Sequence, residues 1–232
     1  MTEITWLGHA TFQLRFDSGN VLLIDPWVES NPAYPKGHKI EKVDAIALSH
    51  GHFDHISDVI PLAKKFNAKV LTMAETAGWL EKKGVKNAVG MNKGGTADLG
   101  FVKLTMTHAI HSNGIKDGDE MVYGGEPAGF VITGSSGPVG YFAGDTDVFS
   151  EMALIREMYA PQIAILPIGD HYTMGPMQAA FAARLLGVKR VVPMHFGTFP
   201  ALTGRPEALA EMVKGDGIEV WTLEPGKPFE WK

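Results

Sequence analysis

The sequence predicts an α/β or α+β fold with mixed β-sheets, on the basis of three observations. Short segments rich in β-branched and aromatic residues recur along the chain and are bounded by Gly, Asp, Asn or Pro, which is typical of strands. Longer segments between them carry apolar residues at helical period. The predicted strands first form a meander and then alternate with helices, and this happens twice. That order favours two sheets packed face to face with helices outside.

Each predicted element follows from these signals. Strands are expected over residues 4–6, 11–16, 21–24, 45–48, 69–72, 102–107, 129–133, 140–143, 163–167, 191–193 and 218–222. Helices are expected over residues 56–66, 74–83, 149–158, 175–186 and 206–214. Gly84 and Gly187 mark the ends of two helices. Pro176 and Pro206 occupy first-turn positions, where a helix tolerates proline.

Length and composition indicate a single domain, residues 1–232. A chain of 232 residues, 45% of them hydrophobic, can bury roughly 70–75% of its unfolded surface. No internal repeat or linker divides it. Because the formal net charge is -5 and no basic run is present, a nucleic acid is not expected as a stable partner.

The chain contains no cysteine, which excludes disulfides, Cys-based zinc sites and a Cys nucleophile. Its first residues form neither a basic nor an apolar leader region. No apolar run approaches the ~20 residues of a membrane span. We therefore expect a cytoplasmic protein without a membrane span.

The most informative segment is S-H-G-H-F-D-H, residues 49–55. It places His50, His52, Asp54 and His55 within six positions. The segment lies between a predicted strand and a predicted helix, so these side chains are expected on a strand-to-helix turn. Imidazole and carboxylate together suit divalent first-row metals. The alternative interpretation, a solvated polar loop, is disfavoured by this spacing.

Three further candidates each follow a predicted strand: His111, Asp145 and His195. Loops at strand ends carry function because a rigid scaffold positions them, so these side chains could converge with the first cluster. Taken singly, Asp145 could cap a turn in G-D-T-D, and His195 could be a buried histidine of the core. Together with the cluster at His50, a metal role is favoured.

The H-x-H-x-D-H pattern resembles the signature of the metallo-β-lactamase superfamily. Other segments match a small, single-domain branch of metal-dependent hydrolases: W-L-G-H-A-T-F (6–12), I-D-P-W (24–27), A-G-D-T (143–146), P-I-G-D (167–170), Y-T-M-G-P (172–176) and H-F-G-T-F-P (195–200). That branch is similar to ascorbate-6-phosphate lactonase and, more distantly, to N-acyl-phosphatidylethanolamine phospholipase D. The resemblance implies an α+β fold, a four-layer αβ/βα sandwich of two mixed sheets with outer helices.

The resemblance also implies a dinuclear metal centre. The implied ligands are His50, His52 and His111 for one divalent ion, Asp54, His55 and His195 for the other, and Asp145 as a bridge. Zn²⁺ suits this imidazole-rich set, with Mn²⁺ and Ni²⁺ as alternatives. A metal-bridging hydroxide, oriented by Asp54 as the catalytic residue, would attack a small-molecule ester, lactone or phosphodiester. The alternative function is a non-catalytic metal-binding or interaction protein, and a homo-oligomer stays open.

Four other residues could serve the same site. His9 and His171 are candidates for binding substrate or for supporting the ligands. Asp25 and Asp170 could accept hydrogen bonds that fix the tautomers of ligand histidines. For both aspartates a turn or capping role is an equal alternative.

Two histidines compete in T-H-A-I-H, residues 107–111. Residues 102, 104 and 106 share a strand face with His108, so His108 should point toward the core. His111 lies past the strand, where the chain is free to turn toward the strand ends. We therefore assign His111 to the metal and His108 either to packing or to a supporting position behind the ligands. The Gly-rich stretch 112–129 could be a mobile lid or a plain hairpin loop.

Overall fold

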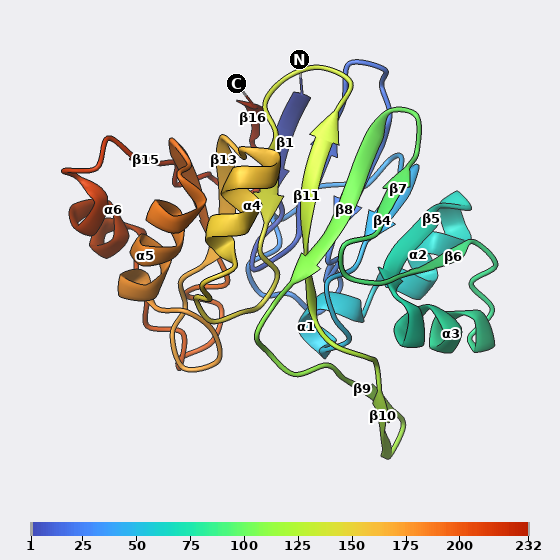
Figure 1. Ribbon diagram of the computed structural model, residues 1–232. Helices are drawn as coiled ribbons and strands as arrows, with labels where there is room; N and C mark the ends of the chain where they lie inside the picture. Colours follow the sequence, from blue (N-terminus) through green and yellow to red (C-terminus); the bar gives the residue numbers. More distant parts are fainter. Residues whose placement is uncertain (1, 232) are drawn as a thin grey trace.

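The computed structural model describes residues 2–231 and has four layers (Figure 1). Two β-sheets pack face to face, and helices cover both outer faces. In spatial order, the first sheet contains β16 (Pro228–Trp231), β1 (Thr2–Trp6), β2 (Phe12–Arg15), β3 (Val21–Ile24), β4 (Ala45–Ala47), β5 (Lys69–Met73) and β6 (Ala88–Met91). The second contains β15 (Glu219–Val220), β14 (Arg190–Met194), β13 (Ile163–Pro167), β12 (Gly140–Phe142), β11 (Ala128–Gly134), β8 (Val102–His108) and β7 (Thr96–Asp98).

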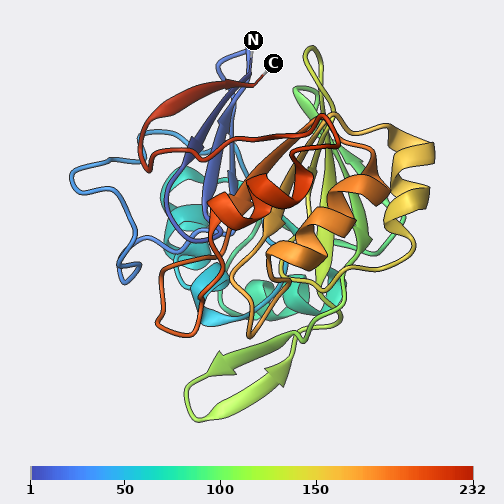
Figure 2. The same cartoon turned by 90° about the vertical axis from the view of Figure 1, so that its left-hand side faces the viewer.

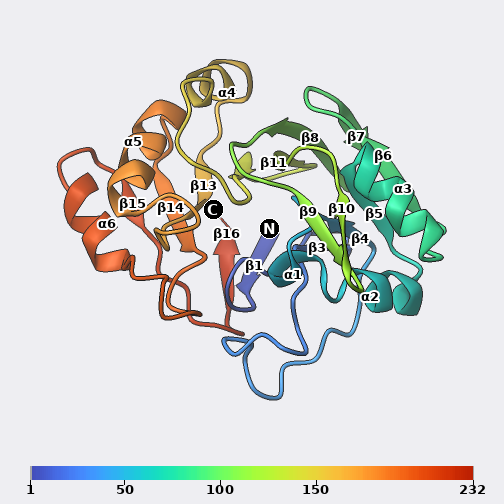
Figure 3. The same ribbon diagram turned by 90° about the horizontal axis from the view of Figure 1, so that it is seen from below.

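The helices divide between the two outer layers, and one hairpin stands apart from both sheets. The first sheet is covered by α2 (Val59–Phe66) and α3 (Ala74–Lys82), and the single turn α1 (Phe53–Ile56) precedes α2. The second sheet is covered by α4 (Met152–Tyr159), α5 (Pro176–Leu186) and α6 (Pro206–Val213). A separate hairpin of β9 (Gly114–Asp117) and β10 (Glu120–Tyr123) projects from one end of the sandwich (Figure 1), and Figure 3 looks onto this end. The predicted α+β sandwich with mixed sheets is confirmed.

Side-chain alternation in β4 shows how the layers are built. Ala45 and Ala47 face the core between the two sheets, whereas Ile46 and Leu48 pack into the core beneath α2 and α3. All four residues are fully buried. A strand covered on both faces reads as a continuous apolar run, which is why this segment shows no polar alternation. The segment that leads into the histidine motif is therefore held rigidly.

Parallel strands bring the candidate ligands to one edge of the sandwich. In the first sheet β3, β4 and β5 run parallel, and in the second β12, β13 and β14 do so. Asp25, His50, Asp145 and His195 each follow the carboxyl end of one of these strands or the residues just beyond it. The hairpin and α1 lie at this edge, and both chain ends lie together at the opposite edge (Figures 1 and 2).

The structure corrects the predicted helix over residues 56–66. Residues 53–66 form two helices, and the chain breaks at Asp58, whose carboxylate accepts hydrogen bonds from Val28 N and Glu29 N at 2.6 and 3.2 Å. The first of them, α1, begins inside the histidine motif. Asp54 and His55 therefore lie on a helical turn rather than in a loop.

Several strands were not predicted: β6, β7, β9, β10 and β16. Of these, β6, β7 and β16 lie at sheet edges, and β9 and β10 form the separate hairpin. Such strands bury few side chains, so their sequences lack the apolar pattern of central strands. The expected strand 218–222 is reduced to β15. The helix signals were right: α5 ends at Gly187 with a positive φ of 62°, and α5 and α6 carry proline in their first turns.

Candidate metal centre

Three groups of potential metal ligands meet at this edge, and one of them, Asp25 with His50 and His55, shares its histidines with the other two. We call His50, His52 and His111 the outer group, and His9, Asp54, His55 and His195 the inner group. Within each group, one ligand atom per residue lies within 4.8 Å of the others. In the outer group, His52 Nδ1 lies 3.0 Å from His50 Nε2 and 3.2 Å from His111 Nε2. Three imidazole nitrogens thus face one point.

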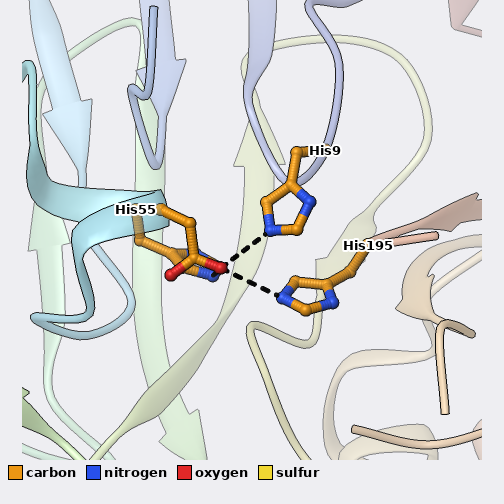
Figure 4. Close-up of side chains that lie close together, drawn as sticks. His9, His55 and His195 are labelled. Atoms are coloured by element: carbon orange, nitrogen blue, oxygen red, sulfur yellow. Dashed lines mark hydrogen bonds and ion pairs between the residues drawn. The ribbon is translucent and has the colours of Figure 1, made fainter. Parts of the chain in front are cut away.

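The inner group is assembled from three distant segments of the chain. Figure 4 shows His9, His55 and His195 pointing toward one another. The Oδ2 atom of Asp54 lies 3.0 Å from His9 Nε2, 3.5 Å from His195 Nε2 and 4.0 Å from His55 Nε2. This carboxylate oxygen is therefore surrounded by three imidazoles.

Asp145 lies between the two groups. Its Oδ2 atom is 3.9 Å from His50 Nε2 and 3.7 Å from His111 Nε2, both in the outer group. The same oxygen is 3.4 Å from His55 Nε2 and 3.0 Å from His195 Nε2, both in the inner group. One buried carboxylate oxygen is thus shared by the two groups.

Two glycines allow the chain to approach the site this closely. A Cβ atom at Gly51, between two motif histidines, would lie 2.3 Å from Ile115 Cγ1 of β9. Gly144 precedes Asp145 with a φ of +63°, and a Cβ there would lie 2.6 Å from Ala128 O. A larger residue at either position would displace a neighbouring candidate ligand.

Backbone strain concentrates at the same place. His9, Asp25 and His195 adopt left-handed backbone conformations, with φ of 55°, 44° and 56°. Such conformations cost about 1–3 kcal/mol each outside glycine and persist only where the surroundings enforce them. Here His195 N donates to His9 O at 3.1 Å, which ties two of the strained residues together.

Asp25 is the aspartate that supports a candidate ligand. Its Oδ2 accepts a hydrogen bond from His55 Nδ1 at 2.8 Å, and its Oδ1 accepts one from Ser49 N at 2.7 Å. The Ser49 hydroxyl also donates to this carboxylate. Burial raises the pKa of Asp25, and the hydrogen bonds from His55 and Ser49 oppose that effect. The arrangement turns His55 Nε2 toward the shared oxygen of Asp145.

The electrostatics of the site separate two kinds of histidine. Burial lowers the pKa of His50 well below its usual value, and burial together with the neighbouring His195 lowers the pKa of His9 to about 4. For His195, burial lowers the pKa, but the carboxylates of Asp145 and Asp54 outweigh it and raise the value to about 9. Imidazoles that bind a metal must be neutral. A bound metal cation would therefore replace the proton on His195 as the positive charge beside Asp145 and Asp54.

The pKa values of the two candidate carboxylates, Asp54 and Asp145, are lowered by the neighbouring histidines. Burial raises the pKa of Asp54, but His55, His195 and His9 together lower it below its usual range. Burial also opposes ionisation of Asp145, and His195 and His55 again hold its pKa well below the ordinary value. Both carboxylates are therefore ionised at neutral pH.

The donor set fits divalent metal ions. Within residues 2–231, the buried atoms His55 Nε2, His195 Nε2 and Asp145 Oδ1 have no hydrogen-bond partner of acceptable geometry. Buried polar atoms are rarely left unsatisfied, and cations are one way to satisfy them. Imidazole nitrogen and carboxylate oxygen suit zinc and its first-row neighbours.

A cavity of about 700 Å³ opens onto both groups. Its floor includes His52, His111, Asp54, Asp145 and His195. The remaining lining residues are Phe53, Ser112, Tyr172, Phe199, Pro200 and Ala201. This volume is in the range of small-molecule sites.

Three of the residues considered from the sequence lie elsewhere. His171 is exposed and packs edge-on against Tyr172, and it does not line the cavity. Asp170 is a turn residue, because its Oδ1 accepts a hydrogen bond from His171 N at 2.7 Å. His108 is half-buried against Phe149 and beside Lys93, outside both ligand groups.

Other residues of the site were not predicted. Thr198 Oγ1 lies 3.0 Å from His9 Nδ1, and the aromatic residues Phe53, Phe199 and Tyr172 line the cavity. Phe53 carried a signal, because it is the one aromatic residue inside the polar motif. The others depend on loops that meet only in the folded chain.

The fold and the ligand motif can now be compared with known proteins. The sequence pattern of the Beta-lactamase superfamily domain matches residues 20–196. The chain belongs to this superfamily. Its metallo-β-lactamase character agrees with the sandwich and with the histidine-rich edge. The narrower resemblances to a lactonase and a phospholipase stay predictions.

Similar members of the superfamily are metal-dependent hydrolases. A UPF0173 metal-dependent hydrolase of Solibacter usitatus is 59% identical over 229 residues, covering 99% of this chain and 100% of the relative. One from Koribacter versatilis is 53% identical, covering 98% and 97%. A metallo hydrolase of the archaeon Ignicoccus hospitalis has a similar structure, with a TM-score of 0.87, 36% identity and coverage of 100% and 99%.

From these relatives, the protein is a metal-dependent hydrolase. Its His/Asp cluster is able to bind metal. Among the residues that the structure describes, no helix combines the length and apolar character needed to cross a bilayer.

Proposed function

We propose that this protein is a dinuclear hydrolase that cleaves carboxylic ester, lactone or phosphodiester bonds in small molecules. The observation that carries the proposal is the position of Asp145. Its Oδ2 atom lies within 3.9 Å of imidazole nitrogens from both ligand groups. A carboxylate shared in this way is suited to bridging two cations.

The proposed ligands follow the two groups. His50, His52 and His111 would hold one ion, Asp54, His55 and His195 would hold the other, and Asp145 would serve as a ligand to both. We assign His9 to supporting Asp54 rather than to either ion. Zn²⁺ is the proposed native metal, with Mn²⁺ and Ni²⁺ as the competing assignments.

Two such ions would supply hydroxide near neutral pH and polarise the oxygen of the bond to be cleaved. The chain's own contribution centres on Asp54. With a pKa of about 4, His9 is neutral at pH 7. Its Nε2–H then donates to Asp54 Oδ2, while its Nδ1 accepts from the Thr198 hydroxyl. These contacts hold the Asp54 carboxylate in one orientation, ready to accept a proton from the attacking water.

The test combines metal analysis with turnover. Full-length protein is loaded with Zn²⁺, Mn²⁺ or Ni²⁺, its metal content is measured, and bis-p-nitrophenyl phosphate and simple lactones are offered as substrates. We expect close to two equivalents and turnover of at least one class. Asp145→Asn should lose both ions and lower kcat/KM more than about 100-fold, because a shared ligand matters more than the supporting groups whose loss costs 10–100-fold.

Asp147→Asn is the matched control, because this neighbouring aspartate is exposed and belongs to neither group. It should keep metal and turnover. A metal content near zero after loading would contradict the dinuclear assignment. Full loading without turnover of any substrate would instead favour a metal-binding protein that reuses the fold.

A further inference from the structure

One side of the cavity is built from aromatic rings. We call Trp27, Phe53 and Phe199 the aromatic wall. Trp27 stacks on Phe199 with a centroid distance of 5.7 Å and an interplanar angle of 26°, and it meets Phe53 edge-on at 5.7 Å. Phe53 and Phe199 lie 6.2 Å apart. Trp27 is buried behind the two phenylalanines, which line the cavity.

The wall is joined to the metal ligands. Phe53 separates His52 from Asp54 in the motif, and the Phe199 ring lies 5.6 Å from the ring of His9. His9 in turn contacts Asp54. A group that rests on Phe199 would therefore lie directly beside the proposed reaction centre.

Packing within the protein does not account for the exposure of these rings. Phe53 is 56% exposed although it lies next to buried ligands, and Tyr172 on another loop around the cavity is 58% exposed. Single exposed apolar residues are common, but a contiguous apolar surface rimmed by polar groups marks a binding site. The wall has the character of a surface that an apolar ligand group would cover.

Apart from the histidines of the two ligand groups, the cavity offers, among the described residues, no side chain that could carry a positive charge. None of the described residues that line it is Lys or Arg. Proteins bind phosphate groups through Arg and Lys or at helix N-termini. The nearby start of α5 is not free for an anion, because a Cβ at Gly175 would lie only 3.4 Å from Cγ of Asp170. A phosphate monoester placed against phenyl rings would lose its hydration without gaining a partner.

We infer that the substrate is a neutral carboxylic ester or lactone whose aliphatic or aromatic substituent packs on the aromatic wall. The inference rests on the proposed hydrolysis and narrows it. The carbonyl group lies over the two ligand groups, and the substituent extends along Phe199 and Phe53. Phosphorylated lactones are poor substrates, although the resemblance to ascorbate-6-phosphate lactonase would favour them.

Matched lactones test the inference on the metal-loaded full chain. γ-Valerolactone and γ-nonalactone share the reacting bond and differ by four methylene groups in the substituent. Burying about two of these methylenes corresponds to roughly a tenfold gain in binding. We therefore expect kcat/KM to be at least about tenfold higher for γ-nonalactone. A γ-lactone with a phosphate monoester on its side chain should be hydrolysed more slowly than either.

Variants locate the preference on the wall. Phe199→Ala and Phe53→Ala should reduce the chain-length ratio to about threefold or less, and Phe199→Leu should restore most of it. Metal content should be the same in all of them. Phe181→Ala is the matched control, because Phe181 is 55% exposed like Phe53 but lies on the outer helix α5. It should keep the wild-type ratio.

A binding measurement separates this inference from the proposed function. The lactams 5-methyl-2-pyrrolidinone and 5-pentyl-2-pyrrolidinone have the same shapes as the two lactones and resist hydrolysis. Calorimetric titration should show tighter binding of the pentyl lactam, and Phe199→Ala should remove the difference. If no lactone is hydrolysed but the pentyl lactam still binds more tightly, the proposed lactone hydrolysis is wrong. The aromatic wall would still be the binding site for an apolar substituent.

Three results would overturn the inference. The first is equal binding of the two lactams together with equal turnover of the two lactones. The second is faster hydrolysis of the phosphorylated lactone. The third is a wall variant that changes the oligomeric state while the chain-length ratio stays at its wild-type value, because the exposed rings would then belong to an interface between chains.

Discussion

The outer and inner ligand groups are held in place in different ways. In the inner group, His55 is fixed by Asp25 and His9 by Thr198, residues from other segments of the chain. In the outer group, the polar contacts are to two serines or among the histidines themselves. Ser49 contacts His50, Ser112 contacts His52, and His52 contacts both other histidines.

Exposure follows the same division for all of these histidines except His50. His9, His55 and His195 are at most 1% exposed and His50 of the outer group is fully buried, whereas His52 and His111 are half-buried and line the cavity. The comparison teaches that the protein itself sets the shape of the inner group. The outer group has less support, so a bound ion must contribute more to its shape. Removing one residue should therefore have different consequences in the two groups.

The largest expected effect is that of Asp54→Asn on turnover. This variant keeps the size of the side chain but removes the negative charge that faces three imidazoles. We expect kcat/KM to fall by about 10²–10⁴, the range for loss of a proton-transfer group. The outer group should still bind one equivalent of metal, which elemental analysis would show.

Asp58→Asn is the control for Asp54→Asn. Asp58 is also a buried carboxylate, but it binds the backbone of the loop after β3. Its substitution should lower the free energy of unfolding and leave metal stoichiometry intact. Unchanged turnover in Asp54→Asn would remove Asp54 from the mechanism.

His111→Ala should weaken the metal bound by the outer group more than about 100-fold, beyond the effect of losing a supporting contact. The reason is that only His50 and His52 would remain there with Asp145. His108→Ala is the paired variant and should reduce stability while metal content persists. Metal titration of both proteins decides the assignment. Loss of metal in His108→Ala and its retention in His111→Ala would reverse it.

Asp25→Asn probes the support of the inner group. An amide can still accept one hydrogen bond, but it cannot accept from His55 and Ser49 with the strength of a carboxylate. Affinity for the inner ion should fall about 10–100-fold, with the outer ion retained. Asp44→Asn is the control. The carboxylate of Asp44 accepts a hydrogen bond from Val21 N at 2.7 Å, and this contact lies away from the site. Equal loss of both ions in Asp25→Asn would mean that the groups are not supported separately.

Much of this site could be predicted from the sequence, and the physical reason is local. His50, His52, Asp54 and His55 are close in sequence, and strand parity together with the resemblance to the hydrolase branch favours His111 over His108. Asp25 was one of two candidates that only the fold could separate. Its strand β3 lies beside β4, whereas Asp170 lies in an exposed turn.

The remaining features depend on contacts between distant segments. The wall contact of Trp27 with Phe199 joins loops more than 170 residues apart in sequence, and no periodic pattern encodes it. The single helical turn α1 is too short to show helical periodicity. The edge strand β16 pairs with β1 and begins at Pro228. Proline is disfavoured within strands, so the sequence of this segment does not indicate a strand.

The smallest expected effect is a pH dependence that changes sign when metal binds. In the metal-free protein the pKa of His195 is about 9, against about 6.5 in the unfolded chain. The folded state therefore holds the extra proton between these values. That stabilisation is complete below about pH 6.5 and is lost as pH rises through 9. Because the pKa of the buried His55 is also raised by Asp145 and Asp54, the free energy of unfolding should fall by at least about 1.4 kcal/mol per pH unit between about pH 7 and 8.5.

The metal-loaded protein should behave in the opposite way over the same range. Its ions require neutral imidazoles, so raising the pH removes the competing protons and strengthens binding, which adds to stability. Urea unfolding of both forms at pH 6.5, 7.5 and 8.5 gives the two slopes directly. His195→Gln, measured without metal, should make the falling slope shallower, and the slope that remains comes from His55. If the free energy of unfolding changes with pH in the same way in both forms, protons and metal do not compete for the inner group. The inner group would then not differ from the outer group in the way proposed here.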